Sequence, residues 1–179
     1  MSSARPLRLA GLVSVAAGGL LVVTQLVGAL ALVVVDADPL RSGNALAGVN
    51  GLLTLLAIYL LLLGLVGLYA RQVAASGTLG LVGFLVAFVG TMLLAGAWWL
   101  EAFAVAYAAA KAPALVAEFP TGRLLAGGTV SFDIFAVGWV LFGIASVRAR
   151  GFPRDAALLL VIGGGIGVLS AVVPGAGRR

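Results

Sequence analysis

Long apolar stretches separated by short polar segments dominate the pattern of this chain. Each stretch reaches the ~20 residues that a helix needs to cross a bilayer, or comes close to it. Helices are expected because lipid offers no partner to an open backbone. The pattern predicts an all-α polytopic transmembrane helix bundle forming a single domain over residues 1–179. It places about five spans at residues 9–35, 45–70, 79–107, 124–147 and 156–173.

The breaks between these stretches carry charge, glycine or proline. The second stretch stops at Arg71, and residues 72–78 predict a short link. The Ala-rich residues 103–112 can continue the third helix until Pro113, which disrupts it. Residues 113–123 predict a loop. The first stretch is longer than the ~7–15 apolar residues of a signal peptide, so we expect it to remain as a span.

Composition supports a lipid environment and removes several chemistries. The chain is 63% hydrophobic and 9% charged, with a mean hydropathy of +1.21, whereas a soluble domain carries roughly 25% charged residues. It contains no Cys, which excludes disulfides and thiol catalysis, and no His, the commonest general base and metal ligand. We therefore expect no cofactor, no metal site and no enzymatic activity.

Basic residues at the helix ends indicate the orientation. Arg5 and Arg8 precede the first span, and the first helix usually dominates topology. This predicts a multi-pass protein of the cell inner (plasma) membrane with a cytoplasmic N-terminus. Arg148, Arg150 and Arg154 follow the fourth span as a stop signal, and we expect them also to bind lipid headgroups. The net charge of +5 is explained by such positions, so no nucleic-acid partner is expected.

An internal similarity links the ends of the second and fourth spans. Residues 63–71 and 142–150 share the pattern apolar-Gly-apolar-x-small-apolar-x-Ala-Arg. Spans two–three and four–five are therefore interpreted as parallel hairpin repeats, with the first helix as an addition, an arrangement found in transporters. The alternative is that apolar helices ending in Arg resemble one another by composition alone.

Two acidic residues fall inside apolar spans, where a charge is costly. Glu101 follows Trp98 and Trp99 in the third span, and its helical face holds small residues such as Gly83 and Gly90. Small residues mark helix–helix contacts in membranes, so this face is expected to point into the bundle. Asp133 lies deeper, within the fourth span. An interfacial Glu101 and a structural Asp133 are the alternative interpretations.

Polar and aromatic side chains at similar heights predict one outward-facing pocket. Gln25 and Asn50 are more often bridges between helices than ligand contacts. They nevertheless fall, like Thr54 and the two carboxylates, in the outer half of their spans, so the sequence predicts a shared site. Its candidate residues are Asp133, Glu101, Gln25, Asn50, Thr54, Trp98 and Trp139.

Three segments also resemble a known group of proteins. Residues 67–72, 80–101 and 138–150 resemble small multi-helix integral membrane proteins of actinobacteria and related bacteria. The resemblance covers roughly residues 64–153 and depends on Gly, aromatic and Arg positions. It implies a helical bundle and supplies no functional residues.

These observations favour a non-enzymatic membrane component, meaning a subunit, scaffold or assembly partner. Its expected partners are membrane lipid and either another membrane protein or further copies of the chain. The alternative is a small transporter or ion pathway, in which Asp133 binds a proton or cation and Glu101 attracts it at the outer mouth.

Overall fold

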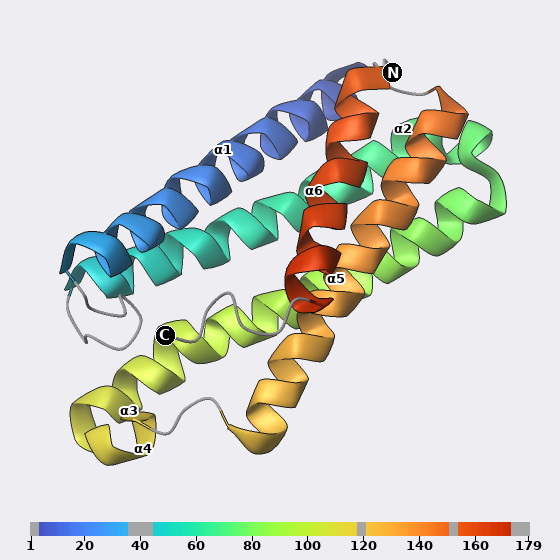
Figure 1. The fold of residues 1–179 in the computed structure, drawn as a ribbon. Coiled ribbons are helices and arrows are strands. Elements are labelled where there is room, and N and C mark those ends of the chain that lie inside the picture. Colours follow the sequence, from blue (N-terminus) through green and yellow to red (C-terminus); the bar gives the residue numbers. More distant parts are fainter. Residues whose placement is uncertain (1–3, 36–44, 118–120, 151–153, 173–179) are drawn as a thin grey trace.

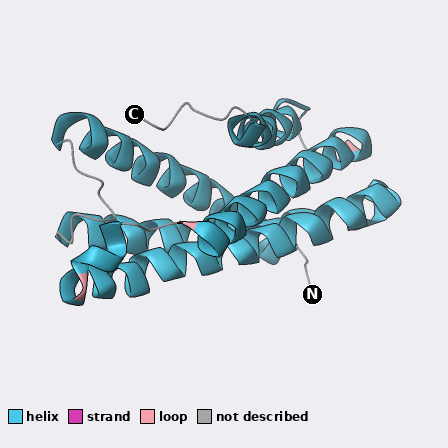
Figure 2. Cartoon of the chain, turned by 60° about the horizontal axis from the view of Figure 1, so that its bottom comes forward, coloured by secondary structure: helices cyan, strands magenta, loops and turns pink. Residues whose placement is uncertain are grey.

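The computed structural model describes residues 4–35, 45–117, 121–150 and 154–172, and these are helical almost throughout (Figure 1). Figure 2 shows helices and short connections, with no strand among the described residues. The elements are α1 (Ala4–Val35), α2 (Ala45–Trp99), the π-helix η1 (Leu100–Val105), α3 (Ala106–Lys111), α4 (Pro113–Ala117), α5 (Gly122–Ala149) and α6 (Arg154–Val172). The all-α prediction is confirmed.

Three helical stretches in the described part of the chain are long and apolar enough to cross a membrane: Arg8–Leu30, Gly48–Lys111 and Gly122–Ala149. Their outer surfaces remain apolar. For example, Val15 is 75% exposed and Leu63 is 62% exposed. A surface with this much exposed hydrophobic area is typical of a protein that is surrounded by lipid or by partner chains.

Helix α2 folds back on itself at Gly77, which divides it into a first arm (residues 45–76) and a second arm (residues 78–99). The Tyr69 and Phe84 rings, one from each arm, stack with centroids 4.2 Å apart. Further from the bend, a Cβ placed on Gly51 would lie 3.5 Å from the Cβ of Ala102 in η1. The arms are therefore antiparallel neighbours, as Figure 1 shows. The expected link at residues 72–78 is helical except at Gly77.

Gly77 has φ 57° and ψ −157°, a conformation that is open almost only to glycine. A Cβ at this position would meet nothing within 4 Å, so a substitution tests the backbone conformation alone. We expect Gly77→Ala to lower the free energy of unfolding by about 1–3 kcal/mol. Thermal unfolding in detergent micelles measures this change. Gly19→Ala, which is helical and also open, is the control and is expected to be neutral or stabilising. Equal melting temperatures for both variants would contradict the prediction.

The second half of the third predicted span continues without a loop into η1 and α3. The helix ends where Ala112 takes φ −146° and ψ 65°, directly before Pro113. This confirms the end that the proline predicted. The segment after Pro113 was expected to be a loop, but residues 113–117 form the short helix α4. Proline is well tolerated in the first turn of a helix, where its missing N–H has no partner to lose.

Successive helices pack on one another through small residues. The main interhelical contacts join α1 to α2, α2 to α5, and α5 to α6. A Cβ on Gly64 would lie 3.2 Å from the Cα of Ser14 in α1, and one on Gly143 would lie 3.0 Å from the N of Val161 in α6. Close backbone approach through glycine is the usual packing of membrane helices. The helices therefore contact one another in the order α1, α2, α5 and α6.

Gly64 and Gly143 occupy equivalent positions in the internal similarity between residues 63–71 and 142–150. They contact different neighbours, since Gly64 faces the preceding helix α1 and Gly143 faces the following helix α6. The matched segments therefore do not share their packing, and the parallel repeat stays a prediction.

Candidate functional site

A cavity of about 790 Å³ lies between the end of the second arm of α2, the start of η1 and the first half of α5. We call it the α2–α5 cleft. Its lining consists of Leu93, Gly96, Ala97, Trp99, Leu100, Glu101, Arg123, Leu124, Leu125, Gly127, Gly128, Thr129, Ser131 and Phe132.

The cleft begins where two closely packed helices diverge. Near the middle of the bundle, a Cβ on Gly90 would lie 2.7 Å from the carbonyl carbon of Ile134 in α5. Beyond this point α5 leaves the second arm of α2, as Figure 1 shows. A Cβ on Gly96, Gly127 or Gly128 would meet nothing within 4 Å. The same small-residue surface is therefore packed on one side of the crossing and open on the other.

Glu101 enters the cleft from a π-helical segment. The six residues of η1 form the π-helix that directly follows α2, and Glu101 is the second of them. An inserted π turn shifts the angular position of every residue after it, and such turns are frequent at functional sites. The side chain of Val105, at the end of η1, is buried. Within η1, Val105 is buried and Glu101 lines the cleft.

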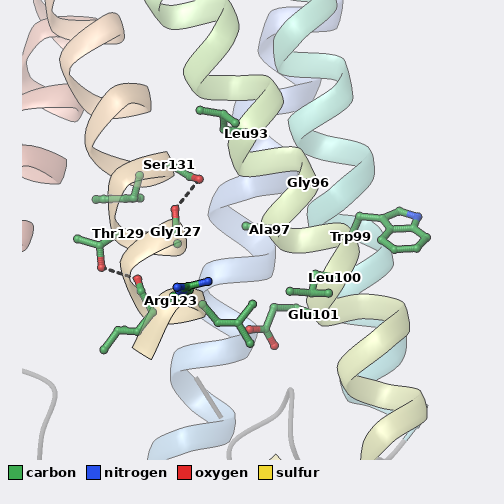
Figure 3. A pocket seen from close by; sticks show the side chains of 14 residues that line it. Leu93, Gly96, Ala97, Trp99, Leu100, Glu101, Arg123, Gly127, Thr129 and Ser131 are labelled. Atoms are coloured by element: carbon green, nitrogen blue, oxygen red, sulfur yellow. Dashed lines mark hydrogen bonds between the residues drawn. The ribbon is translucent and has the colours of Figure 1, made fainter. Parts of the chain in front are cut away.

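The polar groups of the cleft are unevenly distributed. The hydroxyls of Thr129 and Ser131 donate to the carbonyls of Leu125 and Gly127 in their own helix, at 2.9 and 2.7 Å. Figure 3 shows these bonds, with Glu101 and Arg123 on opposite walls at the same end of the cleft. The two hydroxyls already donate within α5. Glu101 and Arg123 are the charged residues of the lining, so the charge of the cleft is concentrated at that end. The remaining wall is apolar and glycine-rich.

Of the candidate pocket residues, Glu101 lines the cleft and the other candidates do not. Trp139 is 5% exposed and lies in the core between α2 and α5, where its Nε1 donates to the Thr91 Oγ1 at 3.2 Å. Trp98 packs against the buried cluster of Leu55, Ile58 and Ala95. Asp133 is partly exposed on α5. One turn of helix separates it from Thr129, yet the cleft does not extend to it.

Of the two amide candidates, Asn50 lies at the contact between α1 and α2, whereas Gln25 does not. Asn50 is 8% exposed, and its Nδ2 lies 3.8 Å from a Cβ placed on Gly28. The Thr54 hydroxyl donates to the main-chain carbonyl of Asn50 at 2.8 Å. Gln25 is exposed, whereas its neighbour Thr24 is 1% exposed. The structure therefore assigns Asn50 and Thr54 to helix packing and does not bring Gln25 to the cleft.

The buried polar positions that the sequence did not single out include Thr91 and Gln72. Thr91 is completely buried and accepts the hydrogen bond of Trp139 while donating to the Ala87 carbonyl at 2.6 Å. Gln72, which the sequence placed in a link, is 1% exposed, and its amide has no hydrogen-bond partner. Nothing in the local sequence distinguishes either residue, because burial at these positions depends on the neighbouring helix.

The predicted headgroup residues are brought together. Arg148, Arg150 and Arg154 line a second cavity, of about 560 Å³, at the turn between α5 and α6. This cavity and the α2–α5 cleft lie at opposite ends of α5. Each is therefore considered as a separate site.

Comparison with protein-family models, with curated proteins and with solved structures finds no match for this chain. The resemblance to actinobacterial membrane proteins stays a prediction, and the interpretation of the site depends on its geometry.

Proposed function

We propose that this chain is a non-enzymatic subunit of the cell inner membrane that holds a transmembrane helix of a partner protein in the α2–α5 cleft. The observation that carries the proposal is a glycine-walled cleft that lies next to the crossing where Gly83, Gly90 and Gly138 pack α2 against α5. The subunit crosses the membrane five times, with the two arms of α2 as separate spans and the N-terminus in the cytoplasm.

The membrane location is supported by the exposed apolar surface. Leu12, Val15 and Leu30 on α1 are 67%, 75% and 61% exposed. At about 25 cal/mol for each Å² of apolar surface, such exposure to water is unfavourable over a whole helix. A bilayer removes this cost without requiring any further burial within the chain.

The partner is proposed to be a helix because of the shape and chemistry of the cleft. Gly96, Gly127 and Gly128 leave room for the backbone of another helix to approach closely, which is how Gly83, Gly90 and Gly138 pair α2 with α5. The walls offer few groups that would orient a small polar substrate, since the two hydroxyls already donate to their own helix. Dispersion contacts along an apolar helix suit this surface better.

An ion pathway through Asp133 and Glu101 has less support. A pathway requires its carboxylates to face one continuous space, and the cleft that Glu101 lines does not reach Asp133. Proton flux into liposomes that exceeds that of empty liposomes, and that is lost in Asp133→Asn, would instead favour the pathway.

Site-specific photocrosslinking in native membranes tests the proposed partner. A photoreactive residue replaces Thr129 on the cleft wall, and a matched one replaces Val15 on the exposed face of α1. We expect a discrete protein adduct from position 129 and lipid or diffuse products from position 15. Gly128→Leu, which fills the cleft, is expected to reduce the adduct by about ten-fold, equivalent to ~1.4 kcal/mol. Gly19→Leu on α1 is the matched control and leaves the adduct unchanged.

Gel filtration and thermal unfolding of both leucine variants establish that they fold. A folded Gly128→Leu variant that keeps the full adduct would overturn the proposal. An adduct between two copies of this chain would overturn the heterologous partner and assign the cleft to self-association.

A further inference from the structure

Positive charge is concentrated where α5 ends and α6 begins. The packing of these two helices on each other does not require it. Arg148, Arg150 and Arg154 line the 560 Å³ cavity together with Val147. All three arginines are exposed. Arg148 lies in the last turn of α5, Arg150 directly follows α5, and Arg154 is the first residue of the antiparallel helix α6.

Arg150 is an unusual residue type for its position at the end of a helix. Arg150 follows the last residue of α5 and has φ 51° and ψ 26°, in the left-handed region. This position usually holds glycine, because a side chain is disfavoured there. An arginine at this position directs a guanidinium to the cavity at a conformational cost. Unfavourable backbone conformations of this kind are found where the side chain has a function.

The charges at this turn do not balance. Among the described residues, no carboxylate lines the cavity, and Asp155 on the first turn of α6 is outside its lining. Three guanidinium groups around one cavity repel one another. The N-terminus of α6 begins at Arg154 and adds a partial positive charge from the helix dipole. A bound anion would relieve this repulsion.

We propose that Arg148, Arg150 and Arg154 form a binding site for a phosphate group. Guanidinium groups bind phosphate through paired hydrogen bonds, and arginine is the preferred residue for such recognition. The cavity lies where two long apolar helices end, at the level at which phospholipid headgroups would lie around the protein. The phosphate can therefore belong to an anionic phospholipid or to a soluble phosphate. This site does not depend on the partner proposed for the α2–α5 cleft.

Native mass spectrometry of the full chain in detergent, titrated with phosphatidylglycerol, tests the site. Arg150→Gly is the informative variant, because it removes the guanidinium and also relieves the left-handed backbone. We expect this variant to bind phosphatidylglycerol about five-fold more weakly, as ~1 kcal/mol per arginine implies. Its melting temperature without added lipid should be unchanged or higher. Lys111→Gln, at the exposed end of α3, is the one-charge control and should bind as the wild type does.

Inorganic phosphate added at millimolar concentration distinguishes the two sources. Binding of phosphatidylglycerol that persists in phosphate identifies a lipid site. Displacement of the lipid, together with protection of the arginines from a guanidinium-modifying reagent by phosphate alone, identifies a soluble phosphate. Equal phosphatidylglycerol affinity in Arg150→Gly, Lys111→Gln and the wild type would overturn the proposal. A lower melting temperature for Arg150→Gly with unchanged lipid binding would assign Arg150 a structural role only.

Discussion

Trp139→Ala is expected to lower the free energy of unfolding by about 3–5 kcal/mol, the range found when large aromatic side chains are removed from a packed core. Trp139 is 5% exposed and belongs to the buried cluster with Leu65, Ala87 and Phe142. Its ring meets the ring of Phe142 edge to face, with centroids 6.1 Å apart. The alanine variant therefore leaves a cavity between both arms of α2 and α5.

Chemical denaturation in detergent micelles measures this loss, and Trp139→Phe separates its two causes. The phenylalanine keeps most of the apolar contact and loses the hydrogen bond from Nε1 to the Thr91 Oγ1. A bond of this kind in a membrane protein contributes ~0.6 kcal/mol on average. Trp139→Phe should therefore cost about 0.5–1 kcal/mol. A loss below about 1 kcal/mol for Trp139→Ala would contradict this description of the core.

Gly138→Val is expected to separate α2 from α5 and to cost about 3 kcal/mol, the upper end of ordinary overpacking. A Cβ on Gly138 would collide with backbone atoms of Ala87 and lie 2.6 Å from the carbonyl carbon of Val86. Backbone atoms cannot move aside as the end of a flexible side chain can. The two helices must therefore shift apart along the whole of their contact.

Gly163→Val on α6 provides the control, because a Cβ there meets nothing within 4 Å. Thermal unfolding should show a large decrease in melting temperature for Gly138→Val and a small one for Gly163→Val. If both variants melt together, the close approach of α2 and α5 at Gly138 is contradicted.

These two substitutions also bear on the α2–α5 cleft. The contacts of Gly83, Gly90 and Gly138 fix where α2 and α5 cross, and the cleft opens from that crossing toward Glu101. A change that moves the crossing would alter the width of the cleft without touching its lining. Photocrosslinking from position 129 in Gly138→Ala, a milder variant, measures this effect directly.

Local features that the sequence identified correctly are those that depend on neighbouring residues in the chain. Long apolar runs can satisfy their backbone only as helices, and Pro113 ends the helix before it because its ring excludes the preceding turn. The prediction that the small residues on the face of Glu101 contact another helix was also correct, since Gly83 and Gly90 contact α5. The periodicity of a helix places these residues on one side whatever the fold.

The pocket could be predicted only in part. The sequence placed Glu101 and Asp133 in the outer halves of their spans, and the expected pocket joined them. Whether two side chains share a space depends on the rotation of each helix and on the crossing angle between them. The sequence contains neither quantity. Gln25 is an example: the rotation of α1 about its axis buries the neighbouring residue Thr24 and leaves Gln25 exposed.

The sequence by itself determined that this chain is helical, apolar and without His or Cys, because these properties follow from composition and local periodicity. The tertiary structure decided which helical faces meet, where α2 and α5 diverge to leave a glycine-walled cleft, and that three arginines from two helices surround one cavity. The α2–α5 cleft is formed by residues distant in the sequence, and the packing of backbones at a few glycines sets its geometry.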